Sequence, residues 1–161
     1  MLAKFILWCY KAPVLEWFRN AKYAIPVLQS FHLLGLTAVL GVICIISIRL
    51  LGVGFLKLPL STLWRELSRW FLGALVMTIS AGVIIAIIDP TRYLANTPFR
   101  IKMCILATAI LFHYTIFRRV VRSAPDAEVP RTTGGRAALG FVSLLLWFSV
   151  GWAGRLIAFF N

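Results

Sequence analysis

The two histidines are the residues of this chain most able to do chemistry, because both lie in segments apolar enough to cross a lipid bilayer. His32 lies within residues 25–53 and His113 within residues 101–121. Imidazole is a common protein ligand for haem iron and for several transition metals. An ionisable side chain at membrane depth needs a partner, so its presence there indicates a function. The pair is therefore the first candidate for a metal or haem site.

The spacing of the histidines predicts that their rings lie at similar depth. His32 is seven residues after Ile25, about 10 Å along its helix, and His113 is ten residues after Met103, about 15 Å along its own. The first and third spans of an up-and-down bundle run parallel. Two imidazoles that face each other across a bundle can hold one b-type haem by both axial positions. The alternative is structural: each ring hydrogen-bonds a carbonyl or hydroxyl group of a neighbouring helix.

A haem also carries two propionate groups, which need cationic or hydrogen-bonding partners near the membrane surface. The candidates on the side nearer both histidines are Arg92, Tyr93, Arg100 and Arg155. Arg155 interrupts an apolar run, and a guanidinium group recognises a carboxylate through two parallel hydrogen bonds. For Arg100 and Lys102, the binding of lipid phosphate groups is an equal alternative.

Composition places these residues in an integral membrane protein. The chain has 161 residues, of which 61% are hydrophobic and 14% charged, and its mean hydropathy is +0.90. A soluble domain of this size could not cover so much apolar surface with so few charges. The net charge is +12, but the basic residues cluster at the ends of apolar runs, where they meet lipid head groups. We therefore expect membrane lipids as partners, and no nucleic acid.

Four apolar stretches have the length of about 20 residues that a spanning helix needs. They cover about 25–53, 67–88, 101–121 and 137–158. Short connections between them predict an all-α, integral membrane four-helix bundle, with residues 1–161 as a single membrane domain. Residues 1–22 or so are too interrupted to span, and we expect them to form an interfacial helix along the bilayer.

Charge gives only a weak indication of orientation, because the basic residues divide almost evenly between the two sides of the bundle. The cluster of Arg118, Arg119 and Arg122 favours the cytoplasm for the 1–2 and 3–4 loops. The acidic residues all lie outside the middle of the spans, which disfavours a proton pump or a cation-coupled carrier. The chain has no hydrolase or nucleotide-binding motif either, so we expect an electron-transfer subunit more than an enzyme.

The chain resembles an uncharacterised family of small four-helix bacterial membrane proteins along nearly its whole length, which implies the bacterial inner membrane. The resemblance is carried by APVLE (12–16), IPVLQSFHLLGL (25–36), IRLLG (48–52), TRYLANTPFRIK (91–102) and AGR (153–155). More remotely it resembles the four-helix b-type cytochromes, which implies His32 and His113 as axial haem ligands. It also resembles the copper-resistance D membrane proteins, which implies copper handling with Met77, Met103 or Cys104.

These observations lead to one main hypothesis and two alternatives. The main hypothesis is a membrane-embedded b-type cytochrome that transfers electrons through a bis-histidine haem. It would work as a subunit or partner of a larger redox system, with a peripheral oxidoreductase, a c-type cytochrome or membrane quinone as the redox partner. The alternatives are a copper transport or copper-responsive protein, and a non-redox structural subunit that anchors a membrane complex.

Overall fold

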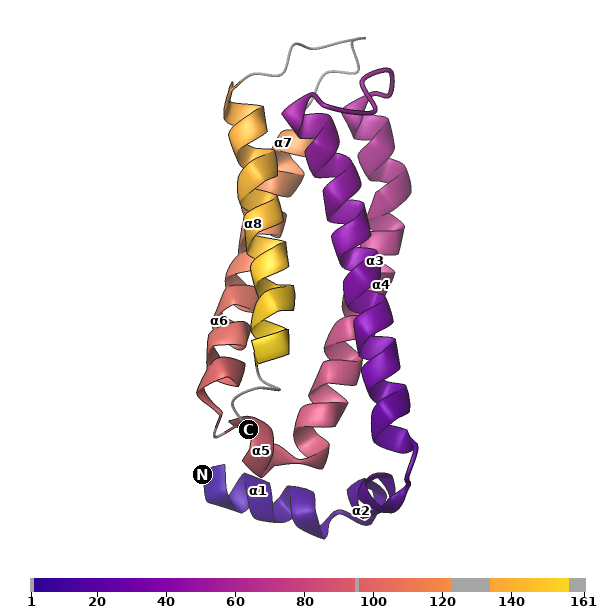
Figure 1. Cartoon of the computed structure of the whole chain (residues 1–161), viewed down its shortest axis with the longest axis vertical. Helices are drawn as coiled ribbons and strands as arrows, with labels where there is room; N and C mark the ends of the chain where they lie inside the picture. Colours follow the sequence, from indigo (N-terminus) through magenta and orange to yellow (C-terminus); the bar gives the residue numbers. More distant parts are fainter. Residues whose placement is uncertain (1, 95, 123–133, 157–161) are drawn as a thin grey trace.

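Four long helices dominate the computed structural model, which describes residues 2–94, 96–122 and 134–156 (Figure 1). The first two spans are α3 (Ala24–Leu51) and α4 (Leu60–Ile88), and the fourth is α8 (Gly134–Leu156). The third combines α6 (Thr97–Phe112), a π-helical turn η1 (His113–Phe117) and α7 (Arg118–Arg122). Each is long and apolar enough to cross a membrane. The predicted all-α membrane bundle is therefore confirmed, and it indicates an integral membrane protein in contact with lipid.

The helices differ in length from the apolar runs that predicted them. α4 begins seven residues before position 67, because Trp64 is buried and packs beside Phe71. The third span begins four residues before position 101, with Pro98 in its first turn, where a missing N–H group costs no helical hydrogen bond. α3 ends two residues before position 53, because Gly52 takes the left-handed conformation (φ 76°) that terminates helices.

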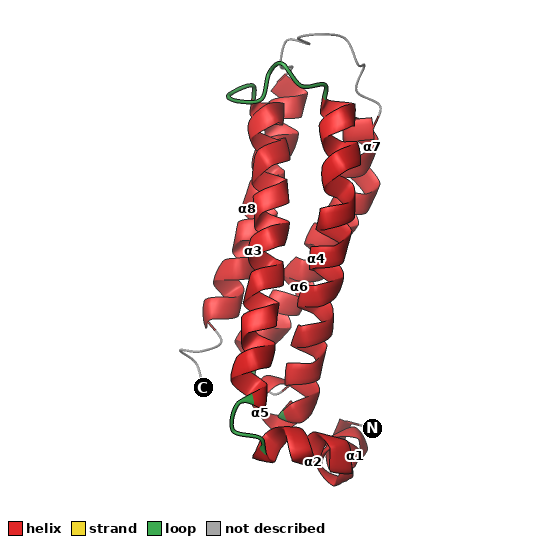
Figure 2. Ribbon diagram, turned by 90° about the vertical axis from the view of Figure 1, so that its right-hand side faces the viewer, coloured by secondary structure: helices red, strands yellow, loops and turns green. Residues whose placement is uncertain are grey.

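The bundle consists of two helix pairs that contact each other through α3 and α8 and separate towards the end near α5 (Pro90–Leu94) (Figure 1). α3 packs along α4, and α6 packs along α8, while α3 also contacts α8 (Figures 1 and 2). α4 meets the third span mainly at α7, the end that bears the 1–2 loop. At the opposite end, near α5, side chains from both pairs line a pocket.

The predicted interfacial segment is two short helices rather than one, and they lie across the end of the bundle near α5 (Figure 2). α1 (Leu2–Lys11) and α2 (Pro13–Asn20) are separated by Ala12, whose extended backbone is the conformation that a following proline favours. The Arg19 guanidinium donates hydrogen bonds to the carbonyls of Cys9 and Tyr10 in α1, and to that of Ile88 at 3.2 Å. One side chain therefore ties α1 and α2 to the end of α4.

Gly35 allows α3 and α4 to approach closely beside the pocket. A Cβ at this position would clash with the Thr78 hydroxyl and would lie 2.9 Å from the Ala74 carbonyl oxygen. We expect Gly35→Val to lower the free energy of unfolding by about 1–3 kcal/mol, the usual cost of overpacking, because the backbone of α4 must move. Thermal or denaturant unfolding in detergent measures this cost.

Gly41 supplies the matched control for that substitution, since it lies on the same helix and a Cβ there meets nothing within 4 Å. Gly41→Val should therefore leave the unfolding transition nearly unchanged. An equal loss of stability in both variants would mean that valine itself, and not the close approach of α3 to α4, causes the effect.

Candidate functional site

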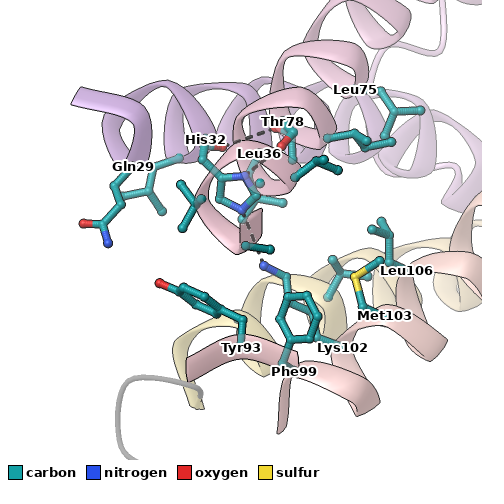
Figure 3. Close-up of a pocket in the computed structure, with 18 of the residues that line it drawn as sticks. Gln29, His32, Leu36, Leu75, Thr78, Tyr93, Phe99, Lys102, Met103 and Leu106 are labelled. Atoms are coloured by element: carbon teal, nitrogen blue, oxygen red, sulfur yellow. Dashed lines mark hydrogen bonds between the residues drawn. The ribbon is translucent and has the colours of Figure 1, made fainter. Parts of the chain in front are cut away.

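A pocket of about 520 Å³ lies between α3, α4, α6 and α8 in the half of the bundle nearer α5 (Figure 3). This volume falls within the range of about 300–1,000 Å³ that small-molecule and cofactor sites occupy. Most of its wall is aliphatic, and its polar side chains come from four helices: Gln29, His32, Thr78, Tyr93 and Lys102. A site of this composition suits a mainly apolar ligand that is oriented by a few polar contacts.

The pocket reaches the lipid-facing surface of the bundle. Leu33, Val83 and Met103 belong to its lining, and all three are exposed on the outside of the helices. Since these helices have the length and hydropathy of membrane spans, the surroundings of these side chains are acyl chains. A lipophilic molecule dissolved in the bilayer therefore has a lateral route into the pocket.

The backbone of α4 fixes the ring of His32. Its Nδ1 lies 2.8 Å from the carbonyl oxygen of Thr78, and the Thr78 hydroxyl donates to the carbonyl of His32 at 3.2 Å. Gly82 leaves room for the ring, because a Cβ there would lie 3.0 Å from its Cε1 atom. A carbonyl only accepts hydrogen bonds, so Nδ1 is the donor and Nε2 of the neutral ring is an acceptor directed into the pocket. Metal-binding histidines are oriented by the same kind of bond.

Lys102 meets His32 from the opposite wall (Figure 3). Its Nζ lies 3.4 Å from Nε2 of His32, so the amine donates and the ring nitrogen accepts. Gly154 makes space for the amine, since a Cβ there would lie 3.1 Å from Nζ. No acidic side chain of the described residues lines the pocket. Lys102 can therefore serve as a donor to an oxygen atom of a ligand, carboxylates included.

His113 lies in a different environment, a group of rings that we call the aromatic cluster and that comprises Trp64, Phe71, His113, Phe117 and Trp147. Its imidazole stacks on Phe71, with ring centroids 4.1 Å apart and planes inclined by 21°, and on Phe117 at 5.1 Å. The side chain is 1% exposed, and neither ring nitrogen has a hydrogen-bond partner. His113 is the first residue of the π-helical turn, in which the Arg118 amide donates a hydrogen bond to the His113 carbonyl five residues earlier.

The structure does not bring the two histidine rings together. Lys102, in contact with His32, precedes His113 by eleven helical residues, or about 16 Å. On α4, Thr78 bonds His32 while Phe71 stacks on His113, and these two residues are seven positions apart, or about 10 Å. Metal–imidazole bonds are about 2 Å long, so two nitrogens that share one metal lie within about 4 Å. The rings therefore lie in different layers of the bundle, whereas their spacing predicted similar depth, and a haem held by both histidines stays a prediction.

The other predicted site residues are divided between the pocket and the surface. Tyr93 lines the pocket and packs its ring against Phe99 at 5.8 Å. Arg100 and Arg155 are exposed, although Arg155 follows the pocket residue Gly154. The side chain of Arg92 lies outside the described part of the structure. Their roles toward a propionate remain predictions.

The copper alternative has one sulfur atom at the pocket. Met103 belongs to the lining, whereas Cys104 is exposed and Met77 is half-buried. Within residues 2–94, 96–122 and 134–156, no three His, Cys, Asp or Glu side chains come together as a metal-binding group.

Sequence reasoning did not identify Thr78 or pair Lys102 with His32. The available signal for Lys102 was its position, because it is the deeper of the two cations at the start of α6 and is followed directly by an apolar run. Thr78 contributes through its backbone carbonyl, and side-chain chemistry does not reveal such a role.

The comparisons with known proteins give a family without a known activity. The model of a family of unknown function, DUF6644, matches residues 18–160, a range that contains all of the pocket residues. No curated protein and no solved structure matches the chain. None of these comparisons supports a likeness to the copper-resistance D proteins or to the b-type cytochromes.

Proposed function

We propose that this chain, which belongs to the family of unknown function DUF6644, is a membrane-embedded haem b protein that transfers electrons. The observation that supports the proposal is the orientation of His32. Its Nδ1 is held by the Thr78 carbonyl, and its Nε2 is directed into an apolar pocket open to lipid. A histidine in this orientation can bind iron at Nε2 without rearrangement of its helix, once the Lys102 amine moves away from that atom.

The residues of the pocket fit a haem in three respects. His32 supplies a nitrogen ligand, and the aliphatic wall keeps water from the iron, which tunes its reduction potential. Lys102 and Tyr93 offer donors to the propionate oxygens, and Arg155 adds a cation beside Gly154. A bound haem would supply one-electron chemistry, while the chain would bind, orient and insulate it. With His113 in the aromatic cluster, His32 is the one histidine of the described residues that lines the pocket.

The proposal includes a partner and a place. The described residues form helices and short connections, so electrons must come from or pass to another molecule. A peripheral oxidoreductase, a c-type cytochrome and membrane quinone are the candidates, and a larger redox complex is the natural setting. We place the protein in the bacterial inner membrane with the 1–2 and 3–4 loops in the cytoplasm, since Arg118, Arg119 and Arg122 lie at that end of the third span.

An absorption spectrum tests the proposal. Protein purified from cells with ample haem should be red, with a b-type α-band after reduction by dithionite and close to one haem for each chain. Metal analysis of the same sample should find iron and no copper, which separates haem from the copper alternative. A colourless, correctly folded protein from such cells would contradict haem binding.

A second candidate ligand is membrane quinone, and the contact between Lys102 and His32 favours it. A quinone carbonyl oxygen accepts hydrogen bonds. Lys102 is a hydrogen-bond donor at the polar end of a pocket that opens towards the lipid. Solvent extraction of the purified protein distinguishes the two ligands. Quinone at about one molecule per chain, with no haem band, would favour this candidate over the first.

A further inference from the structure

The pocket is polar at one end and apolar at the other. Its outer end, near α5, is lined by polar side chains: Gln29, His32, Tyr93 and Lys102. Its inner end, toward the middle of the bundle, is lined by apolar side chains: Val39, Leu75, Leu106 and Trp147. In α6, Leu106 lies one turn farther from α5 than Lys102 does (Figure 3). The polarity of the pocket therefore runs in the same direction as that of the lipids beside it, from the head groups to the acyl chains.

Lys102 is a cation with hydrogen-bond donors to spare at the polar end. An ammonium group carries three donors and no acceptor. Within residues 2–94, 96–122 and 134–156, its amine makes one hydrogen bond, with Nε2 of His32 at 3.4 Å. None of the described side chains that line the pocket is acidic, so the amine has no counter-ion there. Because an unpaired charge is costly in apolar surroundings, the pocket favours a ligand with a negative charge at this end.

The contact between Lys102 and His32 distinguishes such a ligand from haem. Iron can bind Nε2 of His32 only when the amine has moved away from that atom. A carboxylate needs the amine alone, so it can bind while the contact stays intact and use the remaining donors of the ammonium group. The inference that follows rests on the geometry of the pocket and goes beyond the proposed haem function.

We infer that the pocket of the haem-free protein binds a long-chain fatty acid, with its carboxylate at Lys102 and its acyl chain along the apolar inner end. One cation in the lining matches the single charge of a carboxylate. On α3 the lining extends from Gln29 to Val39, ten residues or about 15 Å, and the volume of about 520 Å³ suits one acyl chain rather than the two chains of a phospholipid. The acid enters from the bilayer through the opening at Val83 and Met103.

A photoreactive fatty acid tests the inference. The full chain is produced in cells that cannot make haem and is placed in phosphatidylcholine nanodiscs with palmitic acid that carries a diazirine in mid-chain. We expect irradiation to label the inner end of the pocket, at Leu75 or Leu106. Excess palmitate should remove this label, whereas methyl palmitate, which has the same chain without the charge, should not.

Three results would overturn the inference. The first is label confined to outward-facing residues such as Trp70 and Leu145. The second is equal competition by palmitate and its methyl ester, since the charge would then have no partner in the pocket. The third is a chain that elutes as folded protein only with haem, since the pocket would then have no haem-free state. Absence of haem from protein made with ample haem would contradict the proposed function and leave the fatty-acid result unchanged.

A pair of lysine variants assigns the carboxylate to Lys102. Lys102→Met removes the charged donor, so the palmitate concentration that halves the labelling should rise by about 10–100-fold. Lys22→Met is the control, because Lys22 is an exposed lysine directly before α3, at the same end of the bundle. An unchanged concentration in Lys102→Met would contradict the site. An equal rise in both variants would contradict it too, since it would indicate that surface charge attracts the acid to the membrane.

Discussion

With haem b in the pocket, as proposed, His32→Ala should abolish haem binding, whereas His113→Phe should leave the haem bound. The alanine variant loses the nitrogen that the Thr78 carbonyl holds toward the pocket. Changes to groups that only orient a metal ligand already cost about 10–100-fold in affinity, so loss of the ligand itself should lower haem content by more than about 10-fold. The ratio of haem absorbance to protein absorbance, with iron analysis, measures this loss.

The structure makes His113→Phe a suitable comparison for His32→Ala, because His113 lies between two phenylalanine rings. Phenylalanine at position 113 keeps a flat ring between Phe71 and Phe117 and removes the two unpartnered nitrogens, so the bundle should stay folded. Size-exclusion elution and the unfolding transition verify this for both variants. Equal loss of haem in the two would support the bis-histidine site that the sequence predicts. Tolerance of both substitutions, with stable co-purification of other subunits, would favour the structural anchor.

Much of the fold follows from composition, because a bilayer admits few alternatives to the spanning helix. Four apolar runs of sufficient length predicted four spans, and the structure has a helix for each. The ends of the helices follow from local details that hydropathy averages out. Trp64 and Phe71 extend the buried face of α4 beyond its apolar run, and the conformation of Gly52 ends α3. Arg19, a charged residue in an amphipathic stretch, bonds across to α4, a contact that no local pattern encodes.

The sequence predicted which side chains of the site could do chemistry, but it did not predict where along the bundle they lie. A histidine at membrane depth is visible in the sequence, but its depth depends on where the helix begins. Counted from the observed start of each span, His32 is eight residues along and His113 is sixteen, a difference of about 12 Å. The prediction counted His113 from Met103, six residues after the true start at Thr97. Because of this difference in the helix start, the prediction placed both rings in the same layer of the bundle, although they lie in different layers.

Lys102→Met is the second substitution with a large expected effect, because it removes a cation beside His32 and keeps an unbranched side chain of nearly the same length. Lys102 donates to His32 Nε2 across the pocket, and an ammonium group there opposes the positive charge that an oxidised haem gains. Iron bound at Nε2 would displace the Lys102 amine from that atom. With the amine turned to about 10 Å from the iron and an effective dielectric constant near 20, the interaction is about 1–2 kcal/mol, or roughly 40–90 mV for a one-electron couple. The midpoint potential should therefore fall by about that amount, as measured by spectroscopic redox titration.

Arg100→Met is the control for this effect, since Arg100 lies on the same helix but is exposed, where water and salt screen its charge. Its midpoint potential should stay close to that of the unmodified protein. If Lys102→Met and Arg100→Met lower the potential equally, the effect comes from overall charge and not from a cation in the pocket. If Lys102→Met keeps the haem but leaves the potential unchanged, Lys102 does not share the site of the iron. The haem would then lie away from the contact between His32 and Lys102, and the haem content of His32→Ala would show whether His32 is still its ligand.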